Sequence, residues 1–172
     1  MTRQASSVPR SSGRTSGDAD AVTDAVLTAS RLLVALSARS IAAIDESITL
    51  PQFRLLVVLS TRGAVNLSML ADQLGVNPST ATRMIDRLIA VGLVSREVNP
   101  TSRREVVVNL TDTGAAVVRQ VTQRRRRDIS RIVGRMPVKH RQGLVDALEA
   151  FTDAGGEPSV ALVDGSGTTD WI

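Results

Sequence analysis

The sequence of 172 residues contains no cysteine and no tyrosine, and aromatic residues make up only 2% of it. The absence of cysteine excludes disulfide bonds, cysteine-ligated zinc sites and thiol redox sensors. A single histidine, His140, excludes a metal site built from several histidines. No GxxxxGK[ST] phosphate loop and no nucleophile–base pair is recognisable. We therefore expect no catalytic residue, no cofactor and no metal site, and we do not expect an enzyme.

Long uninterrupted apolar runs are also missing. No such run approaches the roughly 18 residues that span a bilayer. Residues 1–17 contain arginines but lack the apolar segment of a secretory signal. We therefore expect no membrane partner and a cytoplasmic location.

Positive charge is concentrated in the middle of the chain. Residues 76–135 carry 12 arginines against 5 acidic residues, whereas residues 136–172 carry 2 basic residues against 6 acidic ones. Residues 1–75 are nearly balanced, with 7 arginines against 6 acidic residues. A basic middle segment in an otherwise ordinary chain indicates an element that binds a polyanion.

Both ends of the chain have the composition of tails. Residues 1–17 are rich in serine, arginine and glycine and are predicted to be disordered, because they offer too little apolar surface to offset the entropy of ordering. Residues 155–172 contain four glycines and one proline and are predicted to be loose. The length of the remainder, residues 18–154, suits one folded domain.

Helical spacing of apolar residues predicts a first helix over residues 18–46, with Asp18 or Asp20 as its cap. A second helix follows Thr49, which forms a capping-box pattern with Gln52. A short helix over residues 67–74 should end at Gly75, a residue suited to a left-handed C-cap. The clearest helix start is Asn77-Pro78, because proline fits the first helical position. A stripe of apolar residues then predicts which side of this helix is buried: Ala81, Ile85, Leu88 and Ile89.

Two strand-like runs, residues 93–98 and 105–110, follow this helix and flank a polar loop over residues 99–104. Thr111 is expected to cap a long helix that ends near Met136, and Pro137 to open a last helix ending near Ala154. The predicted fold class is therefore mainly α with a small β-hairpin. A helix-turn-helix at about residues 67–91 and a basic wing at about residues 93–110 make a winged helix-turn-helix lobe. The helices at about 18–46 and 112–154 form a separate helical region.

This arrangement predicts DNA contacts. The start of a helix in the major groove reaches base edges, and its N–H groups favour anions. Arg83 is placed to contact guanine, and Arg87 to contact the phosphate backbone. On the wing, arginines at the tip suit a narrow minor groove. The predicted DNA-binding residues are Ser79, Thr80, Thr82, Arg83, Arg87, Arg103 and Arg104.

The stretch from Leu67 to Gly114 resembles the MarR family of bacterial winged-helix transcriptional regulators. The matching residues are Leu70-Ala71, Leu74-Gly75-Val76, Ser79-Thr80, Leu88, Gly92-Leu93-Val94, Arg96, Arg104, Leu110-Thr111 and Gly114. The resemblance implies a homodimer with intertwined terminal helices, double-stranded DNA with an inverted-repeat operator as partner, and a small-molecule effector whose identity the residues do not indicate. The sequence departs from the family at Ser102, where an acidic residue is usual, and at Asn99, where aspartate is frequent.

The run Arg124 to Arg127 resembles a nucleic-acid patch, but its spacing favours another interpretation. Arg124 and Arg127 share a helix face with two later arginines, and Asp146 and Glu149 share a face of the last helix. If these helices form an antiparallel hairpin, the two charged faces pair within or between subunits. We expect His140 to be a surface residue.

Two functions remain open from the sequence. The first is a dimeric, sequence-specific DNA-binding regulator, a repressor released by a small ligand. The alternative is a winged-helix protein-interaction module without sequence-specific DNA binding. The helix start at Asn77 and the paired wing arginines favour DNA, because a protein interface would be expected to show aromatic anchors.

Overall fold

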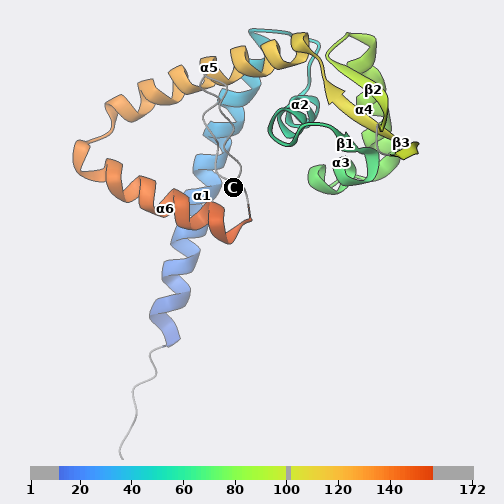
Figure 1. Cartoon of the computed structure of the whole chain (residues 1–172). Coiled ribbons are helices and arrows are strands. Elements are labelled where there is room, and N and C mark those ends of the chain that lie inside the picture. Colours follow the sequence, from blue (N-terminus) through green and yellow to red (C-terminus); the bar gives the residue numbers. More distant parts are fainter. Residues whose placement is uncertain (1–11, 100–101, 157–172) are drawn as a thin grey trace, which may run out of the picture. The chain divides into compact units, whose positions relative to one another are not determined.

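The computed structural model describes residues 12–99 and 102–156, and it gives no side-chain positions for residues 12–16, 99 and 102–105. The chain divides into two units, Met1–Ile129 and Ser130–Ile172, which we describe separately. In order, the elements are α1 (Ser12–Ala42), α2 (Leu50–Arg62), β1 (Val65–Asn66), α3 (Leu67–Leu74), α4 (Pro78–Ala90), β2 (Val94–Asn99), β3 (Ser102–Leu110), α5 (Asp112–Arg135), the 3-10 helix η1 (Val138–His140) and α6 (Arg141–Ala154) (Figure 1). The predicted class, mainly α with a winged helix-turn-helix, is confirmed.

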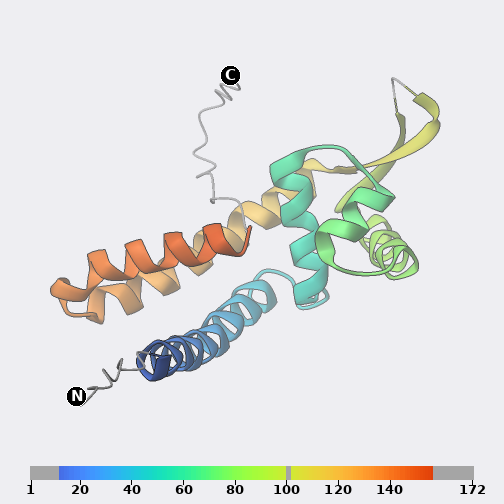
Figure 2. The same cartoon turned by 90° about the horizontal axis from the view of Figure 1, so that it is seen from below.

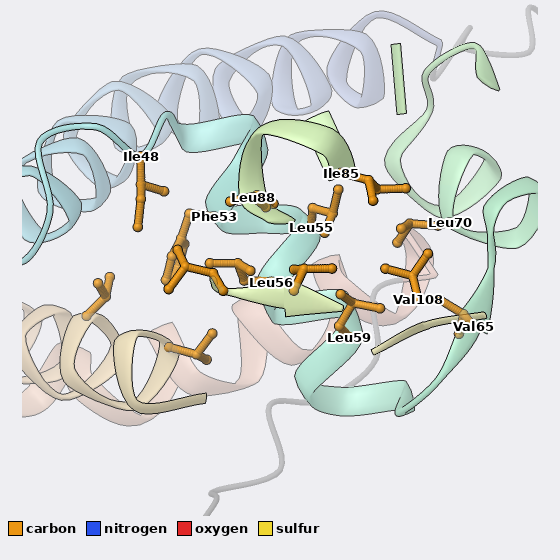
Figure 3. Packing of buried hydrophobic residues seen from close by; sticks show 14 of the residues in the cluster. Ile48, Phe53, Leu55, Leu56, Leu59, Val65, Leu70, Ile85, Leu88 and Val108 are labelled. Atoms are coloured by element: carbon orange, nitrogen blue, oxygen red, sulfur yellow. The ribbon is translucent and has the colours of Figure 1, made fainter. Parts of the chain in front are cut away.

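The first unit is organised around α2. Phe53, Leu55, Leu56 and Leu59 of this helix are buried and pack with residues of α3, α4 and the strands (Figure 3). From the other elements, Leu70, Ile85 and Leu88 are at most 1% exposed. The predicted inner stripe of α4 is therefore confirmed, and it fixes which side of α4 faces outward.

The predicted helix ends are confirmed where they depend on local chemistry. The Thr49 side chain accepts a bond from the Gln52 N–H, and Gln52 Oε1 accepts one from the Thr49 N–H at 2.8 Å, which completes the capping box. Gly75 ends α3 with φ of 65°, in the left-handed region that favours glycine. Thr111 Oγ1 accepts a bond from the Gly114 N–H at the start of α5.

The sheet has three strands, in the order β1-β3-β2, where the sequence predicted only a hairpin. β1 is antiparallel to β3, with Val65 opposite Val108 and Asn66 opposite Val107. A two-residue strand leaves no alternating pattern in the sequence, so it was missed. β3 begins at Ser102, so Arg103 and Arg104 lie in a strand and the predicted loop over residues 99–104 was too long. In Figure 2 the β2–β3 hairpin extends away from α3 and α4.

The predicted boundary between the N-terminal tail and the first helix was wrong. α1 begins at Ser12, so residues 12–17 of the predicted tail are helical and Asp18 and Asp20 lie inside the helix. Extending an existing helix costs little, because each added residue contributes one hydrogen bond. α1 also ends at Ala42, before the predicted Glu46. Residues 1–11 and 157–172 lie outside the described part, so their predicted disorder is untested.

One helix is more apolar than the sequence expectation allowed. Within the helical segment Gly17–Ala42, an 18-residue window has a mean hydropathy of 1.4, and by length and composition alone this helix could cross a membrane. The sequence contains no uninterrupted apolar run here, because Arg31 and Arg39 divide the apolar residues of this helix. An arginine near the middle of a spanning helix, as Arg31 would be, costs about 2.5–3.5 kcal/mol.

In the second unit, a short turn precedes α6. Pro137 is the residue before η1, and α6 begins only at Arg141, four residues later than a helix opened by Pro137 would. The Arg141 guanidinium donates to the backbone carbonyls of Met136 and Gly134, at 3.1 and 3.2 Å for Nη2. These bonds satisfy carbonyl groups at the end of α5.

Candidate nucleic-acid interface

The start of α4 is fixed by its cap. Asn77 Oδ1 accepts hydrogen bonds from the Thr80 N–H and the Ser79 hydroxyl, both at 2.8 Å. Pro78 occupies the first turn. The cap orients the first turn of α4, and the Ser79 hydroxyl keeps its acceptor lone pairs toward solvent because the residue is exposed.

The predicted contact residues of α4 do not all face outward. Ser79, Arg83 and Arg87 are exposed, whereas Thr80 and Thr82 are half-buried. The Thr82 hydroxyl donates to the Pro78 carbonyl at 2.9 Å, so its only proton is used within the helix. Thr82 is therefore placed less favourably for a DNA contact than its neighbours.

Arg83 is directed along its own helix. Its Nη2 donates to Thr80 Oγ1 at 3.4 Å, a long bond between exposed groups. This contact holds the guanidinium near the first turn of α4. It is weak enough to be exchanged for a base or phosphate acceptor.

Arg87 lies at the other end of α4, beside a small hollow of about 160 Å³. The hollow is lined by Arg87, Leu88 and Val91 together with residues before and within α2: Ser47, Ile48, Thr49 and Gln52. The Ser47 hydroxyl already donates to Asp45 Oδ1 at 2.6 Å. This bond uses the only proton of the Ser47 hydroxyl, so Ser47 has no proton left to donate to an anion in the hollow beside Arg87.

The wing is connected to α4 by an ion pair. Arg96 Nη2 of β2 lies 2.9 Å from Asp86 Oδ1 of α4. The sequence analysis did not predict this pair, because spacing along a helix gives no information about a strand that follows it. The side chains of Arg103 and Arg104 lie outside the described part, so the structure locates only their backbone, in β3.

The four-arginine run is on α5. Arg124, Arg126 and Arg127 are exposed and Arg125 is half-buried. Buried Arg125 Nε has no hydrogen-bond partner within the described part of the chain. On α6, Asp146 accepts a hydrogen bond from Gln142 Nε2 at 2.9 Å. The predicted pairing of Arg124 with Glu149 and of Arg127 with Asp146 joins the two units and stays a prediction. His140 is exposed, as predicted.

Comparison with known proteins adds to this geometry. The model of the MarR family matches residues 48–106, which include α2, α3, α4 and β2. The multiple antibiotic resistance protein MarR of Salmonella typhimurium is 38% identical over 82 residues, which are 48% of this chain and 57% of that protein. The chain therefore aligns with little more than half the length of this relative.

Two solved structures extend the similarity to most of the chain. RV1404 from Mycobacterium tuberculosis is 58% identical, with a TM-score of 0.78 over 83% of this chain and 97% of that one. BpsR of Bordetella bronchiseptica is 26% identical, with a TM-score of 0.59 over 77% of this chain and 93% of that one. The similarity thus reaches well beyond the helix-turn-helix and wing.

Proposed function

The chain belongs to the MarR family of DNA-binding transcriptional regulators, and on that premise we propose that it is a homodimeric repressor that binds an inverted-repeat operator and is released by a small ligand. The family consists of regulators and not of enzymes. The proposed location is the cytoplasm, where DNA is accessible to the protein.

One observation carries the DNA-binding part of the proposal. A capped helix, α4, exposes Ser79, Arg83 and Arg87 on the side opposite its buried stripe. A hairpin with three arginines follows directly: Arg96, Arg103 and Arg104. Such a helix fits the major groove, and such a hairpin fits the neighbouring minor groove. Both elements share one hydrophobic core, so they reach DNA as a unit.

Exposed apolar side chains in both units support the dimer. On α1 these are Val22, Leu27, Leu32, Leu33 and Val34, between 38% and 60% exposed. On α6 they are Leu144, Val145, Leu148 and Phe151, between 37% and 54% exposed. Apolar surface of this extent marks an interaction site in a protein that is not embedded in lipid. A second copy of the same helices is the partner we propose.

The regulatory part of the proposal rests on relatives. MdtR of Bacillus subtilis, 35% identical over 69 residues, is a transcriptional repressor. The DNA binding of BpsR is regulated by 6-hydroxynicotinic acid. For this protein we propose that a small ligand controls DNA binding, but we do not propose which one, because no described side chain indicates a particular ligand.

The test is selection of DNA by the full-length protein. Fragments of the source genome are incubated with the protein, and the retained fragments are sequenced and footprinted. We expect an inverted repeat with half-site centres about 10 bp apart, protected by a species of twice the chain mass in sedimentation. Affinity should fall steeply between 50 and 200 mM salt. Retention of no particular fragment would favour a protein-interaction module, and an asymmetric single half-site bound by a monomer would contradict the dimer.

A further inference from the structure

The ion pair between Asp86 and Arg96 connects two elements that the proposed function places in different grooves. Asp86 follows Ile85, which is fully buried, and it lies on α4 between Arg83 and Arg87 in sequence. Arg96 lies opposite Val108 in the sheet, and Val108 is 2% exposed. The pair therefore lies where the buried base of the wing meets the exposed face of α4.

Two cross-strand pairs beyond Arg96, the side chains of the hairpin become exposed. The next pair toward the tip is Glu97 with Val107, and Val107 is still buried at 9% exposed. The pair after it, Val98 with Val106, is 59% and 50% exposed. These two side chains lie on the same side of the hairpin as Arg96, because residues two apart in a strand face the same way. Among the described side chains, this ion pair joins α4 to the hairpin close to the point where the hairpin becomes exposed.

The pair contributes little to stability. Its side chains are 39% exposed at Arg96 and 53% exposed at Asp86, and solvent screens ion pairs of this kind. Its geometry nevertheless fixes one distance between helix and strand. Fixing the geometry of two linked binding elements raises affinity, because the second contact then requires less ordering.

We propose that Asp86 is a positioning residue for DNA binding, and this inference rests on the proposed function. By holding Arg96, it sets the angle of the outer hairpin to α4, so that Arg103 and Arg104 reach the minor groove while Arg83 occupies the major groove. Asp86 itself repels phosphate. Its presence beside Arg83 and Arg87 is therefore unfavourable for DNA binding unless it holds another group in place.

This conflict gives a test, because the two explanations predict opposite changes in DNA affinity when Asp86 is replaced by asparagine. If Asp86 acts only through its charge, Asp86→Asn removes a repulsion and strengthens DNA binding. If Asp86 positions the wing, the same change weakens binding to the operator by ~10-fold, because the wing contacts are no longer pre-aligned. Asp72→Asn is the matched control, because it removes an exposed carboxylate from α3 that is not part of the ion pair with Arg96. The control should bind as tightly as the unmodified protein, or more tightly.

Two further measurements separate positioning from simple misfolding. The salt dependence of Asp86→Asn should become shallower by about two units, one for each wing arginine that leaves the DNA. The exchanged pair Asp86→Arg with Arg96→Asp should bind more tightly than Arg96→Asp alone, and Asp86→Glu should retain most of the affinity. Thermal unfolding of Asp86→Asn should match that of the unmodified protein within a few degrees.

The outcomes are distinguishable. An unmodified protein that selects no operator overturns the proposed function and this inference with it. An unmodified protein that selects its operator, together with Asp86→Asn binding equally or more tightly, overturns the positioning role alone. Weaker binding with a shallower salt dependence and recovery in the exchanged pair supports it.

Discussion

The hydroxyl of Thr111 donates a hydrogen bond at 2.8 Å to the backbone carbonyl of Gly92, 19 residues earlier in the chain. The same oxygen accepts a bond from the Gly114 N–H at 3.0 Å, and the Thr111 N–H donates to the Leu93 carbonyl at 3.2 Å. One residue thus caps α5 and ties its start to the turn between α4 and the wing. This junction fixes the base of the wing to the helix that leads out of the first unit.

Replacing Thr111 by valine should lower the free energy of unfolding by about 1–2 kcal/mol, because the side chain then neither caps α5 nor donates to Gly92. Urea denaturation measures the change. Thr111→Ser keeps both hydrogen bonds and should recover most of it. The exposed neighbour Thr113 provides a control, and equal losses in Thr111→Val and Thr113→Val would show that the junction carries no special stability.

Gly114 lies too close to the wing for any side chain. A Cβ atom there would come within 2.2 Å of the Leu93 carbonyl oxygen, which is backbone and cannot turn aside. Gly114→Ala should therefore destabilise the protein by about 1–3 kcal/mol or more. Gly134→Ala, in the same helix with nothing within 4 Å, should instead stabilise it by up to about 1 kcal/mol. Thermal unfolding of the two variants should move in opposite directions, and a shared direction would contradict the close approach.

The arginines of α4 and of the wing should differ in how much they contribute to the preference for operator over random DNA. Arg83→Ala should weaken operator binding more than binding to random duplex, by about 1–3 kcal/mol if Arg83 contacts a guanine. Arg104→Ala should weaken both, because a wing arginine meets backbone or minor groove. Titrations of both variants against operator and random DNA test this. Equal losses on the two DNAs for Arg83→Ala would limit its role to phosphate.

Arg124 and Arg127 provide the corresponding test on α5. If they pair with Glu149 and Asp146, replacing both by glutamine should leave the salt dependence of DNA binding unchanged and lower dimer stability modestly. Contacts with phosphate would instead reduce the slope by about one unit for each arginine lost. Arg127→Glu should destabilise the dimer, and adding Asp146→Arg should restore part of the loss. If Asp146→Arg restores no stability to Arg127→Glu, and the double glutamine variant reduces the salt slope of DNA binding by about two units, both arginines belong to the DNA-binding surface.

Features that depend on neighbouring residues could be predicted from the sequence. Asn77-Pro78, Gly75 and the Thr49–Gln52 capping box act within a few residues, so their patterns identify helix ends directly. The buried stripe of α4 could be predicted for the same reason. The outward residues of α4 were predicted less well, because the pattern could not show that Thr82 donates its proton to Pro78.

Features that join distant segments could not be predicted. β1 exists only because β3 lies beside it, more than 40 residues later in the chain. The Asp86–Arg96 pair and the Thr111–Gly92 bond likewise need the turn between α4 and the wing to be known first. The start of α1 was missed for another reason. Its first residues have poor helical composition, and their helix is an extension of the apolar stretch that follows.

The short strand β1 makes the lobe a mechanical unit. Asn66 ends this strand opposite Val107 of β3, and its side chain also caps α3 by accepting a bond from the Met69 N–H at 2.9 Å. β3 is the central strand, so it pairs with β2, the other strand of the wing, on one edge and with β1 on the other. A force applied to the wing therefore passes through backbone hydrogen bonds into the first turn of α3, with no flexible linker between them. If a bound double helix displaces the hairpin, this connection would transmit the displacement to the helix-turn-helix.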